Sequence, residues 1–289
     1  MALVLNEEQQ MLRDAARDFL AQRAPVSHLR HLRDSGNEIG FSRELWAEMV
    51  DMGWSAILVP EEYGGLGYGY AGLGLVLEES GRTLTPSPLL GTALTGTASL
   101  LLAGSAEQCG ELLPEVASGE RILARACDEV SHHDPARVET RAEGRGDGYV
   151  LDGRKIAVLD GAAADTLIVS ASSGAGISLF LVPASTPGVT IEPYPSLDIS
   201  VAANVSFEQV ELPASALLGP FDQGQAVLDR VLDIARIGSA AELLGIAQEA
   251  FERTMDYLKE RKQFGVPIGS FQALQHRAAQ LHAEIELSK

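Results

Sequence analysis

The middle third of the chain, about residues 121 to 215, is a series of short β-branched runs separated by turn residues. No segment long enough for a helix lies between these runs. Parallel strands need a helix-length crossover, so this spacing predicts an antiparallel barrel or sandwich. The pair Asp152-Gly153, between two such runs, predicts a two-residue hairpin. Further strand candidates are 166–171, 177–182, 189–193 and 203–211.

Helical patterns flank the β segment on both sides. Asn6, followed by two glutamates and then Gln9, has the features of a helix start, and apolar residues then recur at helical spacing. After position 223 a long helix precedes a Gly-Pro turn, and Ser270 is in place to cap a last helix from Phe271. The other helices are expected at about 43–52, 71–79, 89–102 and 225–262.

This order predicts an α+β fold with three domains. We expect an N-terminal helical domain over 1–120, a middle β domain over 121–220 and a C-terminal helical bundle over 221–289. The last helix pattern is still running at Lys289, with no Gly, Asn or Pro stop signal. We therefore expect an incomplete bundle whose apolar face is covered by a partner or by further chain.

Charge and composition narrow the possible partners. The formal net charge is -18 and the sequence pI is about 4.7, which disfavours binding to nucleic acid or anionic membranes. The two cysteines, Cys109 and Cys127, show neither disulfide nor metal spacing and fit a reducing compartment. We see no secretion signal and no apolar run of the ~18–20 residues that a membrane span needs. The expected location is the cytoplasm.

Two short motifs favour ordinary structural explanations. Gly67 to Gly72 match G-x-G-x-x-G, but no strand precedes them and no acid follows about 20 residues on, so a loop between helices is favoured over a nucleotide site. His132-His133-Asp134 lacks a third ligand at metal spacing, and adjacent side chains point in different directions. A surface loop is therefore favoured over a metal site.

The stretch from Tyr257 to Gln275 carries more information. One interpretation is purely structural: a charged helix end is followed by a Gly-Pro turn and a new helix, and the basic residues complement the helix C-terminus. The same residues could also bind a ligand: Arg261 offers a fork of donors to a pyrophosphate, Phe264 a flat face and Gln272 an amide. The residues alone leave both interpretations open.

Three strings together resemble the acyl-CoA dehydrogenase family: 261–268 with Phe271-Gln272, 53–65, and 148–155. The resemblance covers essentially the whole chain and includes the domain order. It implies that a carboxylate removes the α-proton of an acyl-CoA while hydride passes from the β-carbon to FAD, which gives the 2-enoyl-CoA. It also implies an electron-transfer flavoprotein as the electron acceptor.

The family resemblance assigns roles to individual residues. In the family, the Arg and Phe of the R-x-Q-F-G string reach the FAD of a neighbouring subunit; the string's residues here are Arg261, Gln263 and Phe264, and Gln272 lies close by. Arg236 matches an Arg near the substrate thioester, and Asp233 matches an Asp that contacts the CoA arm.

The departures from the family are concentrated at the flavin face and the base. The segment that reads T-E-P-x-x-G-S-D in the family aligns with residues 127–134 here, where only the final Asp134 is kept and Asp128 replaces the Glu. Cys127 and Asp128 are the candidates in this segment to contact a flavin held by this chain. The family's Trp and Thr on the next strand are Ala157 and Leu159. An apolar Leu leaves a buried flavin group unpaired, at a cost of about 1–3 kcal/mol.

The catalytic base of the family is also missing. It lies either beyond Lys289 or at the position of Ala235, and Glu242, two turns further along the helix, is the substitute candidate.

Several functions fit these departures. The first is a subunit that completes the FAD site of a homologous partner, as in some actinobacterial members that act on steroid-derived CoA thioesters. The second is a diverged homo-oligomeric dehydrogenase that is sufficient by itself. A non-catalytic scaffold or acyl-CoA-binding subunit is a third function that fits, and a flavin monooxygenase on the same fold is a fourth.

Overall fold

The computed structural model describes residues 4–196 and 200–289, and the chain forms two compact units. One unit combines the segment up to Leu29 with Gly74–Thr85 and Ile237–Lys289, and the other combines Arg30–Leu73 with Pro86–Arg236. The three-domain division at positions 120 and 220 stays a prediction.

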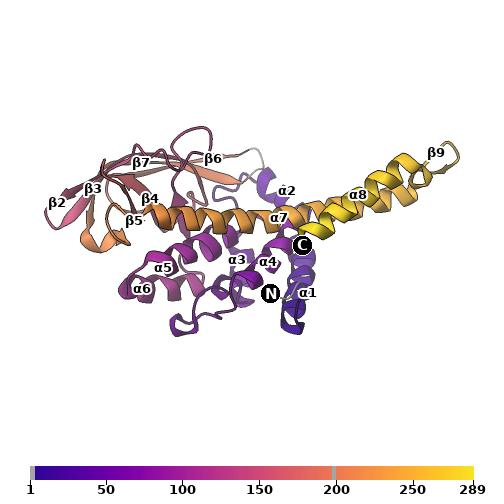
Figure 1. Cartoon of the computed structure of the whole chain (residues 1–289), viewed down its shortest axis with the longest axis horizontal. Helices are drawn as coiled ribbons and strands as arrows, with labels where there is room; N and C mark the ends of the chain where they lie inside the picture. The colour runs from indigo at the N-terminus through magenta and orange to yellow at the C-terminus, as the bar shows by residue number, and fades with distance from the viewer. Residues whose placement is uncertain (1–3, 197–199) are drawn as a thin grey trace. The chain divides into compact units, whose positions relative to one another are not determined.

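The helices expected from the sequence are observed (Figure 1), and α2 and α6 occur in addition to them. A π-helical stretch, Leu89–Gly96, precedes α5 and is almost fully buried, as expected for this small, apolar segment. Short 3₁₀ turns lie at Trp54–Ala56, Glu61–Tyr63, Ala214–Ala216 and Ile268–Ser270. The α-helices are α1 Glu7–Arg23, α2 Val26–Asp34, α3 Arg43–Asp51, α4 Tyr70–Thr83, α5 Thr97–Ala103, α6 Ala106–Ala117, α7 Gln225–Glu260 and α8 Gln272–Ser288.

One predicted helix cap is confirmed and one is wrong. The Asn6 side chain accepts a hydrogen bond from the backbone of Gln9 at 2.8 Å, and the Gln9 side chain accepts one from the backbone of Asn6 at 3.1 Å, which completes a capping box. Ser270 does not cap α8, because its hydroxyl donates to the carbonyl of Pro267 at 2.7 Å. The N-cap of α8 is Phe271, without a side-chain hydrogen bond.

The strands form a mostly antiparallel sheet in the second unit, as predicted. The order is β6-β7-β3-β2-β4-β5-β8; β1 pairs with β4 in parallel, and β2 meets β4 in parallel at one residue pair. Two further short strands, β9 and β10, form a separate pair. The strands are β1 Leu123–Ala126, β2 Arg141–Arg145, β3 Gly148–Leu159, β4 Thr166–Ser172, β5 Ile177–Pro183, β6 Val189–Pro195, β7 Val201–Pro213, β8 Leu217–Leu218, β9 Lys262–Gln263 and β10 Val266–Pro267.

The hairpin predicted at Asp152-Gly153 is wrong. β3 runs straight through this pair, with a bulge against β7 on the C-terminal side of Leu151. Asp152 accepts a hydrogen bond from the backbone of Gln209 at 2.9 Å, and a Cβ on Gly153 would lie 2.6 Å from the Cα of Thr140. This glycine therefore permits a close strand contact rather than a turn. The actual two-residue turn is Gly146-Asp147, between β2 and β3.

The two faces of the sheet have separate cores. One core is enclosed by the strands themselves and includes Leu151, Val169, Phe180 and Phe207. The other lies between the sheet, α5, α6 and the first turns of α7, and includes Cys127, Leu228 and Leu232. Figure 1 shows α5 and α6 covering this face of the strands.

The first unit is held together by an ion network and a close helix crossing. Glu79, only 1% exposed, receives two hydrogen bonds from Arg17 and an ion pair from Arg82. Where α4 crosses α7, a Cβ on Gly81 would lie 2.0 Å from the carbonyl oxygen of Glu242, so only glycine allows this approach.

Candidate flavin-contact site

The turn between α7 and α8 presents the residues of the R-x-Q-F-G string. β9 and β10 pair as an antiparallel hairpin whose two turn residues, Phe264 and Gly265, have φ values of 55° and 81°. Two positive φ values in a two-residue loop are the geometry of a type I′ turn, which twists with the strands it joins. A phenylalanine in this conformation is unusual and carries backbone strain.

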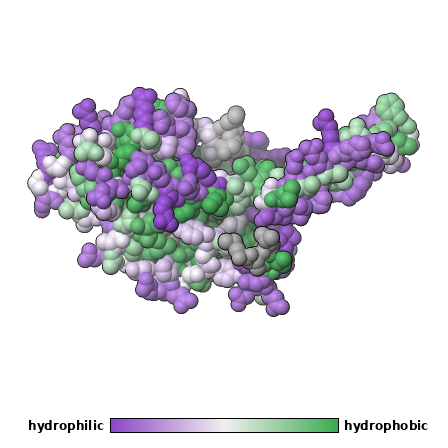
Figure 2. All heavy atoms as spheres, in the orientation of Figure 1, coloured by the Kyte–Doolittle hydropathy of each residue, from purple (hydrophilic) through white to green (hydrophobic). Residues whose placement is uncertain are grey.

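Phe264 is the most exposed large apolar side chain on this turn. It is 92% exposed, and its ring meets that of Phe271 edge-on at 6.2 Å between centroids. Figure 2 shows hydrophobic atoms gathered at the end of the helical hairpin that carries this turn. A ring held in a strained backbone and projected into solvent is placed to contact another molecule.

The polar candidates lie at the same end of the hairpin. Arg261, Gln263 and Gln272 are all exposed. The carbonyl of Arg261 accepts a hydrogen bond from Ile268 at 2.8 Å, which closes the turn, and the Gln263 amide donates to the carbonyl of Lys262 at 2.9 Å. No ion pair engages the Arg261 guanidinium within the described residues. The structure thus brings these four candidates together at one free tip.

Cys127 and Asp128 follow the end of β1 and, unlike the candidates at the tip, are buried or partly buried. Cys127 is 2% exposed and packs in the core between the sheet and the helices. Burial raises the pKa of its thiol to about 11, although Arg125 lies beside it. Asp128 is partly buried and hydrogen-bonds Nδ1 of His133 at 2.9 Å. His132 and His133 are exposed, as the surface-loop interpretation expects.

An ion pair behind this segment was not predicted from the sequence. Lys155 is fully buried, and its Nζ donates to Glu129 at 2.6 Å and to Ser170 at 2.9 Å. Burial lowers the pKa of Lys155. Burial alone would raise the pKa of Glu129, but the hydrogen bonds from Lys155 and Thr140 bring it below the usual value. Glu129 thereby ties the loop after β1 to β3.

Ala157 and Leu159, which stand where the family has a Trp and a Thr, lack the groups that contact a flavin. Ala157, exposed at a φ of 51°, lies in an irregular stretch of β3, and Leu159 is 40% exposed. A methyl group supplies little stacking surface, and Leu159 has no polar atom to pair with a flavin heteroatom. With a buried thiol at Cys127, the middle segment does not fit a flavin held by this chain's own β unit.

The predicted substrate residues occupy one exposed turn of α7. Nη1 of Arg236 lies 2.6 Å from Oδ1 of Asp233, and the two side chains are 59% and 71% exposed. Each therefore pairs with the other rather than with the core. Their roles toward a thioester and a CoA arm stay predictions.

Glu242, the substitute base candidate, lies where α7 meets α4. It is partly buried, and burial raises the pKa of its carboxyl from 4.5 to about 7. Its backbone packs against Gly81, and the backbone of Glu78 packs in turn against Gly245. A pKa near 7 suits proton transfer at neutral pH. The role as a base stays a prediction.

The described residues were compared with the requirements of a metal site and of a membrane-spanning helix. The described residues contain no group of three or more His, Cys, Asp or Glu side chains that could hold a metal ion. Within the same part of the chain, no helix has both the length and the apolar character needed to cross a membrane.

Along the chain, helical segments precede and follow a mostly antiparallel sheet, an order that matches the three-domain fold of the acyl-CoA dehydrogenases. Three family descriptions match the chain: the acyl-CoA dehydrogenase N-terminal domain over residues 6–120, the middle domain over 126–210 and the C-terminal domain over 222–289. This chain belongs to the acyl-CoA dehydrogenase family. Its members are FAD-dependent enzymes that oxidise a CH–CH group of an acyl-CoA.

Individual relatives agree with this assignment. The probable acyl-CoA dehydrogenase YngJ of Bacillus subtilis is 35% identical over 301 residues, which cover 100% of this chain and 78% of that protein. The solved Tcur3481-Tcur3483 steroid ACAD matches with a TM-score of 0.87 and 37% identity, over 97% of this chain and 74% of that one. The ChsE4-ChsE5 complex from Mycobacterium tuberculosis matches with a TM-score of 0.88 and 28% identity, over 99% and 76%.

Proposed function

We propose that this chain is a subunit of an acyl-CoA dehydrogenase and contributes to a FAD that a homologous partner chain holds. The contributing residues are Arg261, Gln263, Phe264 and Gln272. The observation that carries the proposal is the exposure of Phe264, which is 92% free at the tip of a hairpin with no core to cover it. Covering an aromatic ring of this kind contributes about 1.5–3 kcal/mol, and stacking adds to that value.

The polar groups at the tip suit the phosphate end of FAD. A guanidinium offers a fixed fork of donors to two phosphate oxygens, and such charge-assisted bonds are stronger than neutral ones. Arg261 has no competing carboxylate partner in the described structure. In the assembled enzyme these groups would bind and orient FAD, which would supply the hydride acceptor of the reaction.

The residues of the middle β segment also support a FAD that is held by the partner rather than by this chain. Cys127 is buried, Ala157 provides no ring, and Leu159 provides no hydrogen bond where the family has a flavin contact. The residues that a chain lends to its neighbour are thus present, whereas those that it needs for its own flavin are not. A partner that holds FAD and the catalytic base accounts for both observations.

The relatives support a mixed assembly, and the family supports the reaction. Two of the solved relatives are named as pairs of different chains, Tcur3481-Tcur3483 and ChsE4-ChsE5. We extend to this chain an acyl-CoA thioester as substrate, contacted through Asp233 and Arg236, and an electron-transfer flavoprotein as the electron acceptor.

The test is the visible spectrum of the purified chain, first alone and then co-expressed with a homologous family member. The proposal predicts a colourless protein alone and a yellow complex on co-expression that is bleached by an acyl-CoA. A chain that binds FAD in full stoichiometry by itself and is bleached by an acyl-CoA would show a self-sufficient dehydrogenase. A complex that forms without flavin would show a scaffold.

A further inference from the structure

β1 and β2 lie end to end along the same neighbouring strand. Ala126, the last residue of β1, pairs with Val169 of β4, and Arg141, the first residue of β2, pairs with Ser172 of the same strand. The three residue steps between these two positions of β4 span about 10 Å. The chain crosses this short gap with residues 127–140, so the segment leaves the sheet and returns to it. A loop of this length whose two ends lie close together is an Ω-loop.

The side chain of Glu129 closes this loop at its base. Oε2 accepts a hydrogen bond from the backbone amide of Glu139 at 2.5 Å, and Oε1 accepts one from that of Thr140 at 3.0 Å. The two amides lie ten and eleven residues further along the chain, where it rejoins the sheet. The carboxylate therefore supplies the acceptors that these amides would otherwise lack.

Lys155 anchors the same carboxylate to the sheet. Its Nζ donates to Oε1 of Glu129 at 2.6 Å and to the hydroxyl of Ser170 at 2.9 Å. Ser170 lies in the part of β4 that pairs with neither β1 nor β2, so the ion pair fills the gap between those two strands. Both charged side chains are almost fully buried. The base of the loop is thus fixed by charge-assisted bonds at a site away from water.

The tip of the loop is held by fewer and weaker bonds. His133 and Arg137 are exposed, and each forms its ion pair at the surface. Exposed ion pairs contribute little to stability. The backbone amides of Ser131 and His132 have no hydrogen-bond partner among the described residues. The loop therefore depends on its base for its position.

We propose that Glu129 is a latch and that loop 130–138 is a strap that opens as a unit when the latch releases, while the sheet stays folded. Opening breaks the two amide bonds to the carboxylate and exposes the gap beside Ser170. It breaks none of the pairs that β1 and β2 make with β4. Local openings of this kind occur where few bonds and few buried contacts hold a segment. The latch uses neither Arg261 nor Phe264, so this proposal does not depend on flavin binding.

Hydrogen exchange of the full chain, measured at single residues and corrected for intrinsic rates, tests the proposal in the wild type. The amides of Glu139 and Thr140 are expected to exchange about tenfold or more slowly than those of Ser131 and His132, because the latch binds only the first two. They are expected to exchange faster than the amides of β4, because the loop opens without the sheet. Equal rates for all four loop amides overturn the proposal. Rates at Glu139 and Thr140 equal to those of β4 also overturn it.

Two double variants separate the hydrogen bonds of the latch from its charge pair. Lys155→Met/Glu129→Leu removes both charges and both acceptors, so exchange at Glu139 and Thr140 is expected to rise about tenfold or more. Lys155→Met/Glu129→Gln removes the same charges but keeps one carbonyl acceptor, so Thr140 is expected to stay within about threefold of wild type. Equal exchange at Thr140 in the two variants overturns the proposal.

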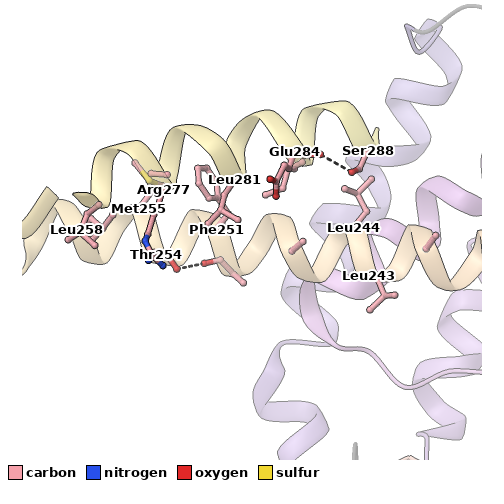
Figure 3. Close-up of a pocket in the computed structure, with 16 residues that line it drawn as sticks. Leu243, Leu244, Phe251, Thr254, Met255, Leu258, Arg277, Leu281, Glu284 and Ser288 are labelled. Atoms are coloured by element: carbon pink, nitrogen blue, oxygen red, sulfur yellow. Dashed lines mark hydrogen bonds between the residues drawn. The ribbon is translucent and has the colours of Figure 1, made fainter. Parts of the chain in front are cut away.

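Two controls distinguish a local latch from a general loss of stability. Arg137→Ala breaks the exposed pair with Glu139 at the tip and is expected to leave exchange at Thr140 unchanged. The parts of α7 and α8 that line the apolar groove in Figure 3 belong to the first unit, so their amides serve as an internal reference. If Lys155→Met/Glu129→Leu raises exchange in β4 or in these helices as much as in the loop, the carboxylate stabilises the whole chain and the latch is disproved.

Discussion

Nζ of Lys155 lies 2.6 Å from Oε1 of Glu129, and the side chains are 0% and 5% exposed. Two charges removed from water in this way depend on each other, because either one alone is left unpaired in the core. The pair links β3 to the loop after β1, which is the segment that faces the flavin in the family.

We expect loss of either partner to destabilise the protein strongly. Lys155→Met and Glu129→Gln should each lower the free energy of unfolding by about 3–5 kcal/mol. Lys155→Met combined with Glu129→Gln should recover part of the loss, because the Gln carbonyl still accepts from the backbone of Thr140. Urea unfolding measures this. Arg154→Met is the control: it breaks an exposed pair with Glu192 at 3.4 Å and should cost less than about 1 kcal/mol. Equal effects of Lys155→Met and Arg154→Met would contradict the account.

The α4–α7 crossing predicts opposite effects for two glycines of the same helix. Gly81→Ala should destabilise by about 2 kcal/mol or more, because its Cβ would lie 2.0 Å from the Glu242 carbonyl oxygen. Gly74→Ala meets nothing within 4 Å and should stabilise by about 0.5–1 kcal/mol through helix propensity. Thermal unfolding by circular dichroism compares them. A stabilising Gly81→Ala would show that the helices are not in contact.

Glu242 predicts a pH dependence of stability. Burial raises the pKa of its carboxyl to about 7 in the folded state, from 4.5 in the unfolded chain. Its contribution is therefore fully present below about pH 4.5 and is lost as the pH rises through 7, by up to about 3 kcal/mol. Glu242→Gln removes this loss, so the variant should gain stability over wild type progressively between these pH values.

Urea unfolding at several pH values measures the difference between Glu242→Gln and wild type. Glu111→Gln, an exposed acid on α6, is the control and should show a difference that does not change over this range. A constant difference for Glu242→Gln as well would mean that its carboxyl is solvated.

Periodicity predicted those elements whose signals are local. The long helix expected at 225–262 is observed as Gln225–Glu260, because its apolar positions recur without an intervening proline. The hairpin at Asp152-Gly153 was wrong because the reason for the glycine is the approach of Thr140, which no local pattern reveals. Glu129 was missed for a similar reason, since its partner Lys155 lies 26 residues away.

The candidate site could be predicted only in part. The candidates at the tip between α7 and α8 came from the resemblance to the family, because an exposed Arg and Phe are equally typical of an ordinary helix end. Their grouping at one free tip follows from the type I′ turn at Phe264 and Gly265, which the sequence suggested only as a Gly-Pro turn. The burial of Cys127 depends on the packing of α7 and the sheet, which strand-by-strand patterns do not contain.

The most direct test of the central claim is the FAD content of the complex between this chain and a homologous partner, measured for wild type and for tip variants. Phe264→Ala and Arg261→Ala should each weaken FAD retention about tenfold or more, because they remove a stacking face and a charge-assisted pair. Tyr257→Ala and Lys259→Ala, exposed residues at the end of α7, should leave it unchanged. FAD content unaffected by Phe264→Ala and Arg261→Ala, in a complex that still forms, would contradict the claim that this chain completes its partner's flavin site.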